Sequence, residues 1–354
     1  MTAVLDRDPA PGAFAARGGL VAAGRRARTR RWRLVVTVLA LVVVALVVLT
    51  LCVGERSYTP AEVVRVLLGE QVPGATFNIW TLRLPRALTG LLVGIAFGMG
   101  GVVFQTMLRN PLASPDIIGI SAGASAAAVV AITMFGMSGL ALSGVAIIAG
   151  VGVAGAIYAL SWRQGVHGAR LILIGIAVGA MLDSVVAYAL TRSSVEDVND
   201  ALRWLTGSLN SAFWPVVGPL ALAMAVLVPA LLLLSRRLSA LQLGDDASAS
   251  LGVAPDRSRL GLLVVGVGLV AVATAGPIAF VAFLSGPIAH RLVRGTGSLL
   301  IPSALVGAVL VVGGDFVGQH LLGTRFPVGV VTGVLGAPYL IWLLARTNRS
   351  GGTL

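Results

Sequence analysis

A short polar turn joins two long apolar runs in Leu82–Ala124, LRLPRALTGLLVGIAFGMGGVVFQTMLRNPLASPDIIGISAGA. The hydrocarbon core of a bilayer offers no water to backbone N–H and C=O groups, so an apolar run of about 20 residues is best accommodated as a spanning helix. The turn Arg109–Asp116 holds two prolines, which oppose helix continuation. The stretch therefore predicts a membrane hairpin.

The composition extends this interpretation to the whole chain. Of its 354 residues, 57% are hydrophobic and 11% are charged, and a soluble domain could not bury so much apolar surface. The single cysteine, Cys52, excludes an intrachain disulfide and a thiolate metal cluster. His167, His290 and His320 lie far apart in sequence and show no metal-ligand spacing. We expect no catalytic, cofactor or metal site in this chain.

The chain contains no lysine: all 26 of its Lys and Arg residues are arginine. A Walker A loop needs its lysine to reach the terminal phosphates of ATP, so this chain cannot itself carry that site. Enzymes with a lysine nucleophile are excluded on the same ground. If ATP and magnesium drive transport, a separate ATPase subunit must use them, and this chain is not an enzyme.

Ten apolar runs predict an all-α membrane protein with about ten transmembrane helices. The two runs that flank Gly276 and Pro277 could also form one bent element. The runs are Leu34–Val53, Ala87–Leu108, Ile117–Phe135, Leu140–Ser161, Leu171–Leu190, Phe213–Leu234, Leu260–Ala275, Ile278–His290, Leu299–His320 and Val328–Leu344.

Arginines are divided unequally between the two sides of this topology. Residues 1–33 form a polar lead rich in Ala, Gly and Arg, for which we predict a disordered cytoplasmic tail. A signal peptide fits less well because the following apolar run is too long, and nucleic-acid binding fits less well than an orientation signal. Nineteen arginines fall on the side of the N-terminus and seven on the other. The expected order is this tail, a membrane domain over 34–345 and a cytoplasmic C-terminal tail over 346–354 in the cytoplasmic (inner) membrane.

Two groups of glycines predict close contacts between helices. Gly90, Gly94 and Gly98 repeat every four residues on one helix face, and a second group crowds another span. Small residues let backbones approach where no hydrophobic effect drives helices together. Tight packing within a helical bundle is favoured over a role in conduction. The second group is Gly144, Gly150, Gly152 and Gly155.

Few polar groups interrupt the spans, and each ionisable one is costly in hydrocarbon. Asp183 lies within one run, and Asp315 lies in another with Gln319 near its outer end. Asp183 could either line an aqueous pathway or pair with a structural partner, and neither role is favoured. For Asp315 the structural role is favoured. The candidates for lining a translocation pathway are Gln105, Asp183, Asp315 and Gln319. Nothing resembles a relay of spaced acids, which disfavours a proton-coupled carrier.

The connection Leu243–Val253, LGDDASASLGV, differs from every other loop. Acids at its start suit a helix N-terminus, and Gly252 suits a helix end, so we predict a short surface helix with caps at both ends. Arginines on both sides place it on the cytoplasmic face. Its small side chains would allow close contact within a partner's groove, and a plain interfacial loop is the alternative.

Several motifs together resemble the FecCD/BtuC-type permeases of binding-protein-dependent ABC importers for ferric siderophores, haem and vitamin B12. The resemblance covers essentially everything after the N-terminal lead. The motifs are LRLPR at Leu82–Arg86, RNPLASPDIIGISAGA at Arg109–Ala124, WLTGS at Trp204–Ser208, LGDDASASLGV at Leu243–Val253, AGPIAFVAF at Ala275–Phe283 and FPVGVVTGVLGAPYLIWLL at Phe326–Leu344.

This resemblance implies a ten-helix permease of the type II importer fold that works with a second permease, two ATPase subunits and an extracytoplasmic binding protein. The span with Asp183 would line the central pathway. Arg83, Arg86 and Arg325 would meet acids of the binding protein outside. The segment that couples to the ATPase would comprise Leu243, Gly244, Asp245, Ala247, Leu251 and Gly252.

Gln319 and Arg325 depart from the family pattern, which often has an arginine and a glutamate at these places, and His290 is displaced from a common Pro-His pair. These departures look like the ferric enterobactin-type, catecholate-siderophore branch and like one half of a heterodimer. The expected cargo is therefore a ferric siderophore. Haem or vitamin B12 is the alternative within the family, and a secondary carrier without ATPases is the alternative outside it. A membrane enzyme would need a cluster of reactive groups that the sequence does not show.

Overall fold

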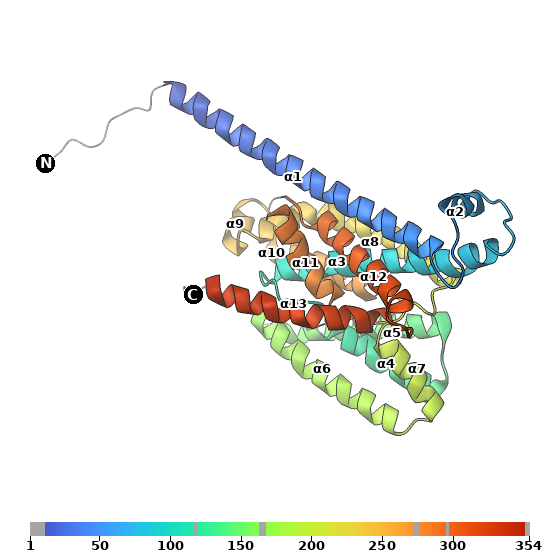
Figure 1. Cartoon of the computed structure of the whole chain (residues 1–354). Coiled ribbons are helices and arrows are strands. Elements are labelled where there is room, and N and C mark those ends of the chain that lie inside the picture. Colours follow the sequence, from blue (N-terminus) through green and yellow to red (C-terminus); the bar gives the residue numbers. More distant parts are fainter. Residues whose placement is uncertain (1–10, 117–118, 163–167, 272–275, 295–296, 351–354) are drawn as a thin grey trace.

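The computed structural model describes residues 11–116, 119–162, 168–271, 276–294 and 297–350, and its regular elements there are helices (Figure 1). The predicted all-α fold is confirmed. Ten helices correspond to the ten apolar runs in the described residues. They are α1 (Pro11–Cys52), α3 (Leu84–Met107), α4 (Ile120–Phe135), α5 (Gly139–Ser161), α6 (Gly168–Thr191), α8 (Trp214–Leu241), α10 (Pro255–Ala271), α11 (Val281–Val293), α12 (Leu300–His320) and α13 (Val328–Ser350).

Six stretches of the described residues are long and apolar enough to cross a membrane, and they lie in α1, α3 with the segment before it, α5, α6, α8 and α12. Shorter apolar stretches make up α4 and α11 and the part Val328–Trp342 of α13. Four small elements lie outside the ten predicted spans, and of these the sequence indicated only α9. They are α2 (Pro60–Leu67), the π-helical η1 (Phe77–Arg83), α7 (Val195–Leu205) and α9 (Asp245–Ser250).

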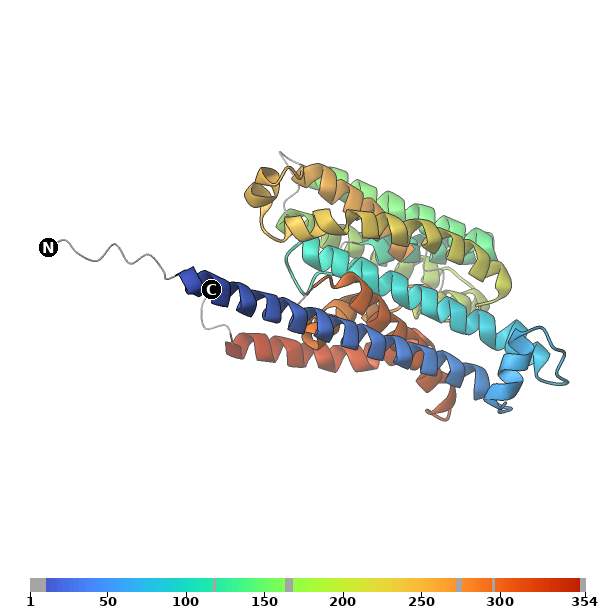
Figure 2. The same ribbon diagram turned by 90° about the horizontal axis from the view of Figure 1, so that it is seen from above.

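Helix α3 is the centre of the bundle and is packed by α8, α10, α11 and α12 (Figure 2). Phe97 and Phe104 of α3 are almost fully buried. At the crossing with α12, a Cβ added to Gly94 would lie 2.5 Å from the carbonyl oxygen of Gly307. The first glycine group therefore serves tight packing, as predicted.

The second glycine group does not serve contacts of this kind within the chain. A Cβ added to Gly144, Gly152 or Gly155 would meet nothing within 4 Å, and only Gly150 of this group approaches another helix, near Ile120 of α4. The prediction of close contacts was wrong for those three glycines. They lie on the side of α5 that no other described helix covers at this distance.

The predicted disordered tail is contradicted where the structure describes it, because α1 begins at Pro11 and continues without a break into the membrane. Residues 1–10 lie outside the described part. Alanine and arginine favour helix, and extending a helix avoids the cost of a new nucleus. The Arg31 guanidinium also donates to the Leu292 carbonyl at 3.1 and 3.0 Å, which ties the extension to the bundle.

Helices α10 and α11 are separate elements, which excludes the alternative of one bent element. Residues 272–275 between them lie outside the described part. Gly276 and Phe280 then take positive φ angles of 76° and 66°. This left-handed backbone precedes Val281, where α11 starts.

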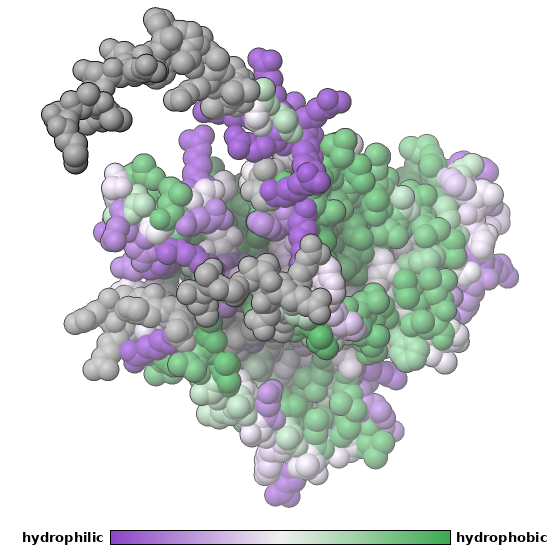
Figure 3. All heavy atoms as spheres, turned by 60° about the vertical axis from the view of Figure 1, so that its left-hand side comes forward, coloured by the Kyte–Doolittle hydropathy of each residue, from purple (hydrophilic) through white to green (hydrophobic). Residues whose placement is uncertain are grey.

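The small elements gather at two opposite ends of the bundle (Figure 1). The α9 end holds α9, the arginine-rich part of α1, the turn 109–116 and the last turns of α13. The α2 end holds α2, η1, α7 and the connection 321–327. Figure 3 shows hydrophilic side chains gathered at the α9 end and hydrophobic side chains on the flank. This distribution fits a multi-pass membrane protein.

Candidate functional site

The short helix α9 is closed at its C-terminal end by a Schellman motif. The N–H of Gly252 donates to Ala249 O at 2.9 Å, and the N–H of Val253 donates to Ser248 O at 3.0 Å. Gly252 supplies the positive φ of 79° that this turn requires. At the other end Gly244 precedes the helix without a side-chain cap. The predicted short helix and its glycine cap are confirmed, but the prediction of a cap at the N-terminal end was wrong, because glycine stands at that position and has no side chain to accept a hydrogen bond.

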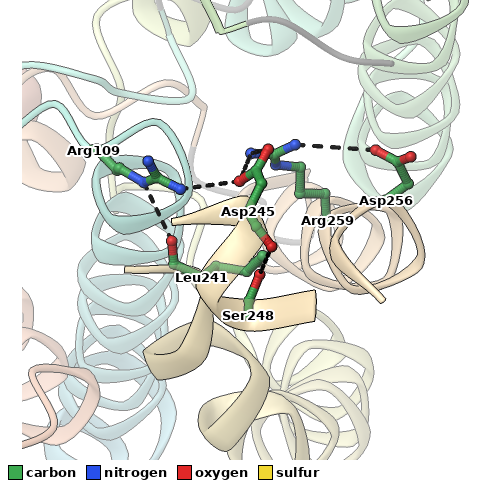
Figure 4. A network of polar contacts seen from close by, with 6 residues as sticks. All are labelled: Arg109, Leu241, Asp245, Ser248, Asp256 and Arg259. Carbon is green, nitrogen blue, oxygen red and sulfur yellow. Dashed lines mark hydrogen bonds and ion pairs between the residues drawn. The ribbon is translucent and has the colours of Figure 1, made fainter. Parts of the chain in front are cut away.

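Asp245 of α9 is held by two arginines from other parts of the chain (Figure 4). Its carboxylate lies 3.0 Å from Arg109 Nη2 and 2.8 Å from Arg259 Nη2. Arg109 also donates from Nε to the Leu241 carbonyl at 3.2 Å, and Arg259 approaches Asp256 at 4.0 Å. Asp245 therefore connects α9 to the turn after α3, to the end of α8 and to the start of α10.

Packing alone holds α9 weakly, because Ser248 is its only buried residue. The Ser248 hydroxyl donates to the Asp245 carbonyl at 2.9 Å. Leu243 and Leu251 flank the helix and are each 64% exposed, and Ala247 is half-buried. The result is a small surface with two exposed apolar residues, oriented mainly by the ion pairs of Asp245.

The turn between α3 and α4 places Arg109 for this contact. Arg109 has a φ of +50°, and the Leu112 N–H donates to Asn110 Oδ1 at 2.9 Å, which closes an Asx turn. Burial raises the pKa of Asp116, and a hydrogen bond from the Ser121 hydroxyl opposes that rise. The sequence predicts this turn, but it carries no signal that pairs Arg109 with a residue more than a hundred positions away.

At the α2 end, Arg86 of α3 and Asp315 of α12 form a bidentate ion pair. Arg86 Nε lies 2.7 Å from Asp315 Oδ2, and Arg86 Nη2 lies 2.7 Å from Asp315 Oδ1. The side chains are 21% and 5% exposed, respectively. Asp315 thus has a structural partner, and that partner is one of the arginines predicted to meet the binding protein. Docking by Arg86 stays a prediction, and it would have to operate on a guanidinium that is already paired.

The other two docking candidates are also engaged within the chain. Arg83 donates from Nη1 to the Leu51 carbonyl at 2.8 Å and lies over the Tyr58 ring at 4.9 Å. Arg325 pairs with Glu55, and both of these side chains are largely exposed. The structure therefore brings all three arginines to the same end, but each has a partner of its own.

The four pathway candidates do not converge on one site. Gln105 is buried between α3 and α11 and donates to the Phe283 carbonyl at 2.9 Å. Asp315 is paired with α3, as described above. Asp183 is exposed on α6. The Nε2 atom of Gln319 is buried and has no hydrogen-bond partner among the described residues.

A cavity of about 730 Å³ opens beside α7 at the α2 end. Its polar lining comes from α7, from the following loop and from the connection before α13. That lining includes Asp200, Arg203, Trp204, Ser208, Asn210 and Arg325.

Sequence reasoning missed most of this cavity because it did not place α7. A signal was present, since Ser194 is followed three residues later by Asp197. The Ser194 hydroxyl accepts from the Asp197 N–H at 3.2 Å, which is a regular N-cap. From the sequence, Arg325 and the WLTGS motif are each recognisable, but nothing in the sequence predicts that they line the same cavity.

Known proteins resemble this chain in sequence. The model of the FecCD transport family matches residues 39–346. The chain belongs to this family. A FecCD relative, the ferric enterobactin transport system permease protein FepG of Escherichia coli (strain K12), is 38% identical over 330 residues, which are 90% of this chain and 98% of FepG. The achromobactin transport system permease protein CbrC of Dickeya dadantii (strain 3937) is 36% identical over 89% of this chain and 92% of CbrC.

A solved structure supports the same FecCD assignment. It is described as an inward-facing conformation of a putative metal-chelate type ABC transporter, and it superposes with a TM-score of 0.79 at 29% identity over 88% of this chain and 98% of that one. Fold and family therefore agree with the predicted ABC permease.

Proposed function

We propose that this chain is the permease subunit of an ATP-driven importer that carries a ferric siderophore across the cytoplasmic membrane. Membership of the FecCD family supports this proposal, as do the ferric enterobactin and achromobactin transport systems to which FepG and CbrC belong. The observation that carries it is α9, an exposed helix that ion pairs orient at one end of the membrane bundle. A secondary carrier would have no need of such a docking element.

The ATPase subunit docks on α9 from the cytoplasm and hydrolyses ATP with magnesium. The excess of arginine at the α9 end supports a cytoplasmic location for that end and for both termini. Leu243 and Leu251 offer apolar contacts to a cleft in the partner. Asp245 then passes a displacement of α9 to α10 through Arg259 and to the turn after α3 through Arg109.

A second permease subunit, preferably a different chain, covers the exposed face of α6. This face shows large apolar side chains on both sides of Asp183. If the two permeases pack face to face here, Asp183 lies beside the pathway between them. The exposed apolar residues are Leu173, Ile176, Met181, Val185 and Tyr188.

At the outer side, an extracytoplasmic binding protein delivers the cargo to the α2 end. Arg203 and Arg325 line the cavity there, and both are opposed by a nearby acid. Release of either guanidinium from its acid would expose a positive charge to an anionic ferric chelate.

Cargo and energy source are tested together by uptake in cells that lack this chain. Complemented cells should regain uptake of a ferric catecholate and not of a ferric hydroxamate or vitamin B12. That uptake should cease when the ATPase subunit is removed. Uptake that persists without the ATPase would establish a secondary carrier instead. Rescue of vitamin B12 or haem uptake would show that the cargo is not a ferric siderophore.

The docking role of α9 is tested by Ala247→Arg, which adds a bulky charge to the half-buried side of the helix. ATP hydrolysis should continue while cargo uptake falls at least about tenfold, because the helix no longer fits its cleft. Ser239→Arg, at an exposed position of α8, serves as the control for an added arginine at the same end. Normal uptake by Ala247→Arg would refute docking through α9.

A further inference from the structure

The arginine-rich part of α1 extends beyond the rest of the bundle at the α9 end (Figures 1 and 2). Six of the nine residues in Arg25–Arg33 are arginine. Among the described residues, Arg25, Arg26, Arg30 and Arg33 form no ion pair with an acid. The transport scheme proposed above makes no use of these charges.

The helical repeat separates the arginines into two faces. Four arginines and Thr29 lie at i, i+1, i+4, i+5 and i+8, which fall on one side of a helix. The same five residues line one open hollow, and all are exposed. We call this set the arginine face. It consists of Arg25, Arg26, Thr29, Arg30 and Arg33.

Two residues outside the arginine face fix α1 to the bundle. Arg31 donates to the Leu292 carbonyl, and Trp32 Nε1 donates to the Ser298 carbonyl at 2.9 Å. Both acceptors lie at or after the end of α11. These contacts hold the helix so that the arginine face points away from the bundle.

The arginine face also follows directly on a lipid-facing surface. Leu34, Leu41 and Val44 of α1 are 60%, 63% and 59% exposed. The apolar part from Leu34 to Cys52 rises about 28 Å at 1.5 Å per residue, close to the roughly 30 Å of a hydrocarbon core. The arginine face, about 12 Å long on the same scale, therefore begins at the level of the lipid headgroups.

We propose that the arginine face binds the phosphate headgroups of anionic phospholipids in the leaflet at the α9 end. Guanidinium groups donate paired hydrogen bonds to phosphate oxygens, and the short side chain of Thr29 leaves space between them for a headgroup. Juxtamembrane clusters of basic residues attract anionic lipid in this way. Lipid is favoured over an acidic protein partner because the face continues the lipid-exposed side of the same helix.

Lipid binding is measured on the purified full-length chain by native mass spectrometry, with phosphatidylglycerol and phosphatidylcholine as probes. The variant is R25Q/R26Q/R30Q, which leaves Arg31 to hold the helix in place. It should retain phosphatidylglycerol about tenfold less well than the unmodified chain, with no change for phosphatidylcholine. R25K/R26K/R30K keeps the charge but loses the paired guanidinium donors, and it should bind phosphatidylglycerol at a level between the unmodified chain and the glutamine variant.

A matched control removes three exposed arginines from elsewhere at the same end, in R236Q/R237Q/R257Q. It should bind phosphatidylglycerol like the unmodified chain. If both triple variants lost phosphatidylglycerol binding equally, the loss would be explained by net charge alone, and the proposal would be overturned. Unchanged lipid binding in the first variant, with loss of a co-purifying ATPase subunit, would assign the arginine face to a protein partner instead.

Discussion

The two ends of the bundle use ion pairs in opposite ways. At the α2 end, Arg86 and Asp315 are largely buried and join α3 and α12, the two helices that pack most extensively. At the α9 end, the acid itself is about half exposed: Asp245 pairs with a half-exposed Arg109 and with Arg259, which is 17% exposed, and it holds a helix that packing hardly fixes. Removal of one partner from a buried pair leaves an uncompensated charge, whereas an exposed pair contributes little to stability. The first pair therefore fixes two core helices to each other, whereas the pairs of Asp245 orient a surface helix.

The largest effect on stability is expected from Arg86→Gln. It leaves the Asp315 carboxylate buried without its partner and should lower the free energy of unfolding by about 3–5 kcal/mol. Thermal unfolding of the detergent-solubilised chain measures this loss. The double variant Arg86→Met/Asp315→Leu removes both charges and should recover most of it. A single variant that unfolds at the unmodified temperature would show that the pair is not buried in the folded chain.

A smaller loss is expected where the same two helices touch through glycine. Gly94→Ala places a Cβ against the backbone of Gly307, and overpacking of this kind costs about 1–3 kcal/mol. Gly152→Ala is the matched control, because its Cβ meets nothing within 4 Å and alanine favours helix. Unfolding temperatures of the two variants should therefore move in opposite directions, and equal shifts would contradict the close crossing of α3 and α12.

Asp245→Asn should change stability little and function strongly. Asp245 is about half exposed, and the more buried Arg259 keeps a second acid, Asp256, at 4.0 Å. The loss should therefore stay within about 0–1 kcal/mol, as for exposed pairs, and the unfolding temperature should change little. Without the carboxylate, α9 loses its links to Arg109 and Arg259, and cargo moved per ATP hydrolysed should fall. The measurement is uptake and hydrolysis by the reconstituted importer. Asp246→Asn, next to it but without an ion pair among the described residues, is the control. If Asp245→Asn moved as much cargo per ATP hydrolysed as the unmodified chain, Asp245 would have no role in coupling α9 to transport.

The sequence predicts the ten helices because the absence of water in the bilayer leaves long apolar runs few alternatives. It also predicts α9, because acids before a run of small residues favour a helix start and a glycine after the run favours a helix end, and both effects are local in sequence. It does not predict which charges meet. Arg86 and Asp315 are each visible as costly groups, yet their pairing depends on the register between α3 and α12. The same holds for Arg109 and Asp245, which tertiary structure alone brings together.

The smallest effect is expected at α2, where Glu62 and Thr59 form a capping box. Hydrogen bonds from the Thr59 backbone N–H and then from its hydroxyl lower the pKa of Glu62. A carboxyl with a lowered folded pKa contributes stability that is present above its unfolded pKa, about 4.3, and is lost as pH falls through the folded value. Below about pH 4, amide hydrogen exchange in α2 should therefore approach that of Glu62→Gln measured at the same pH. Exchange at α9, which has no such box, should show no difference between the two chains, and a difference there would mean that the two ends are coupled through the bundle.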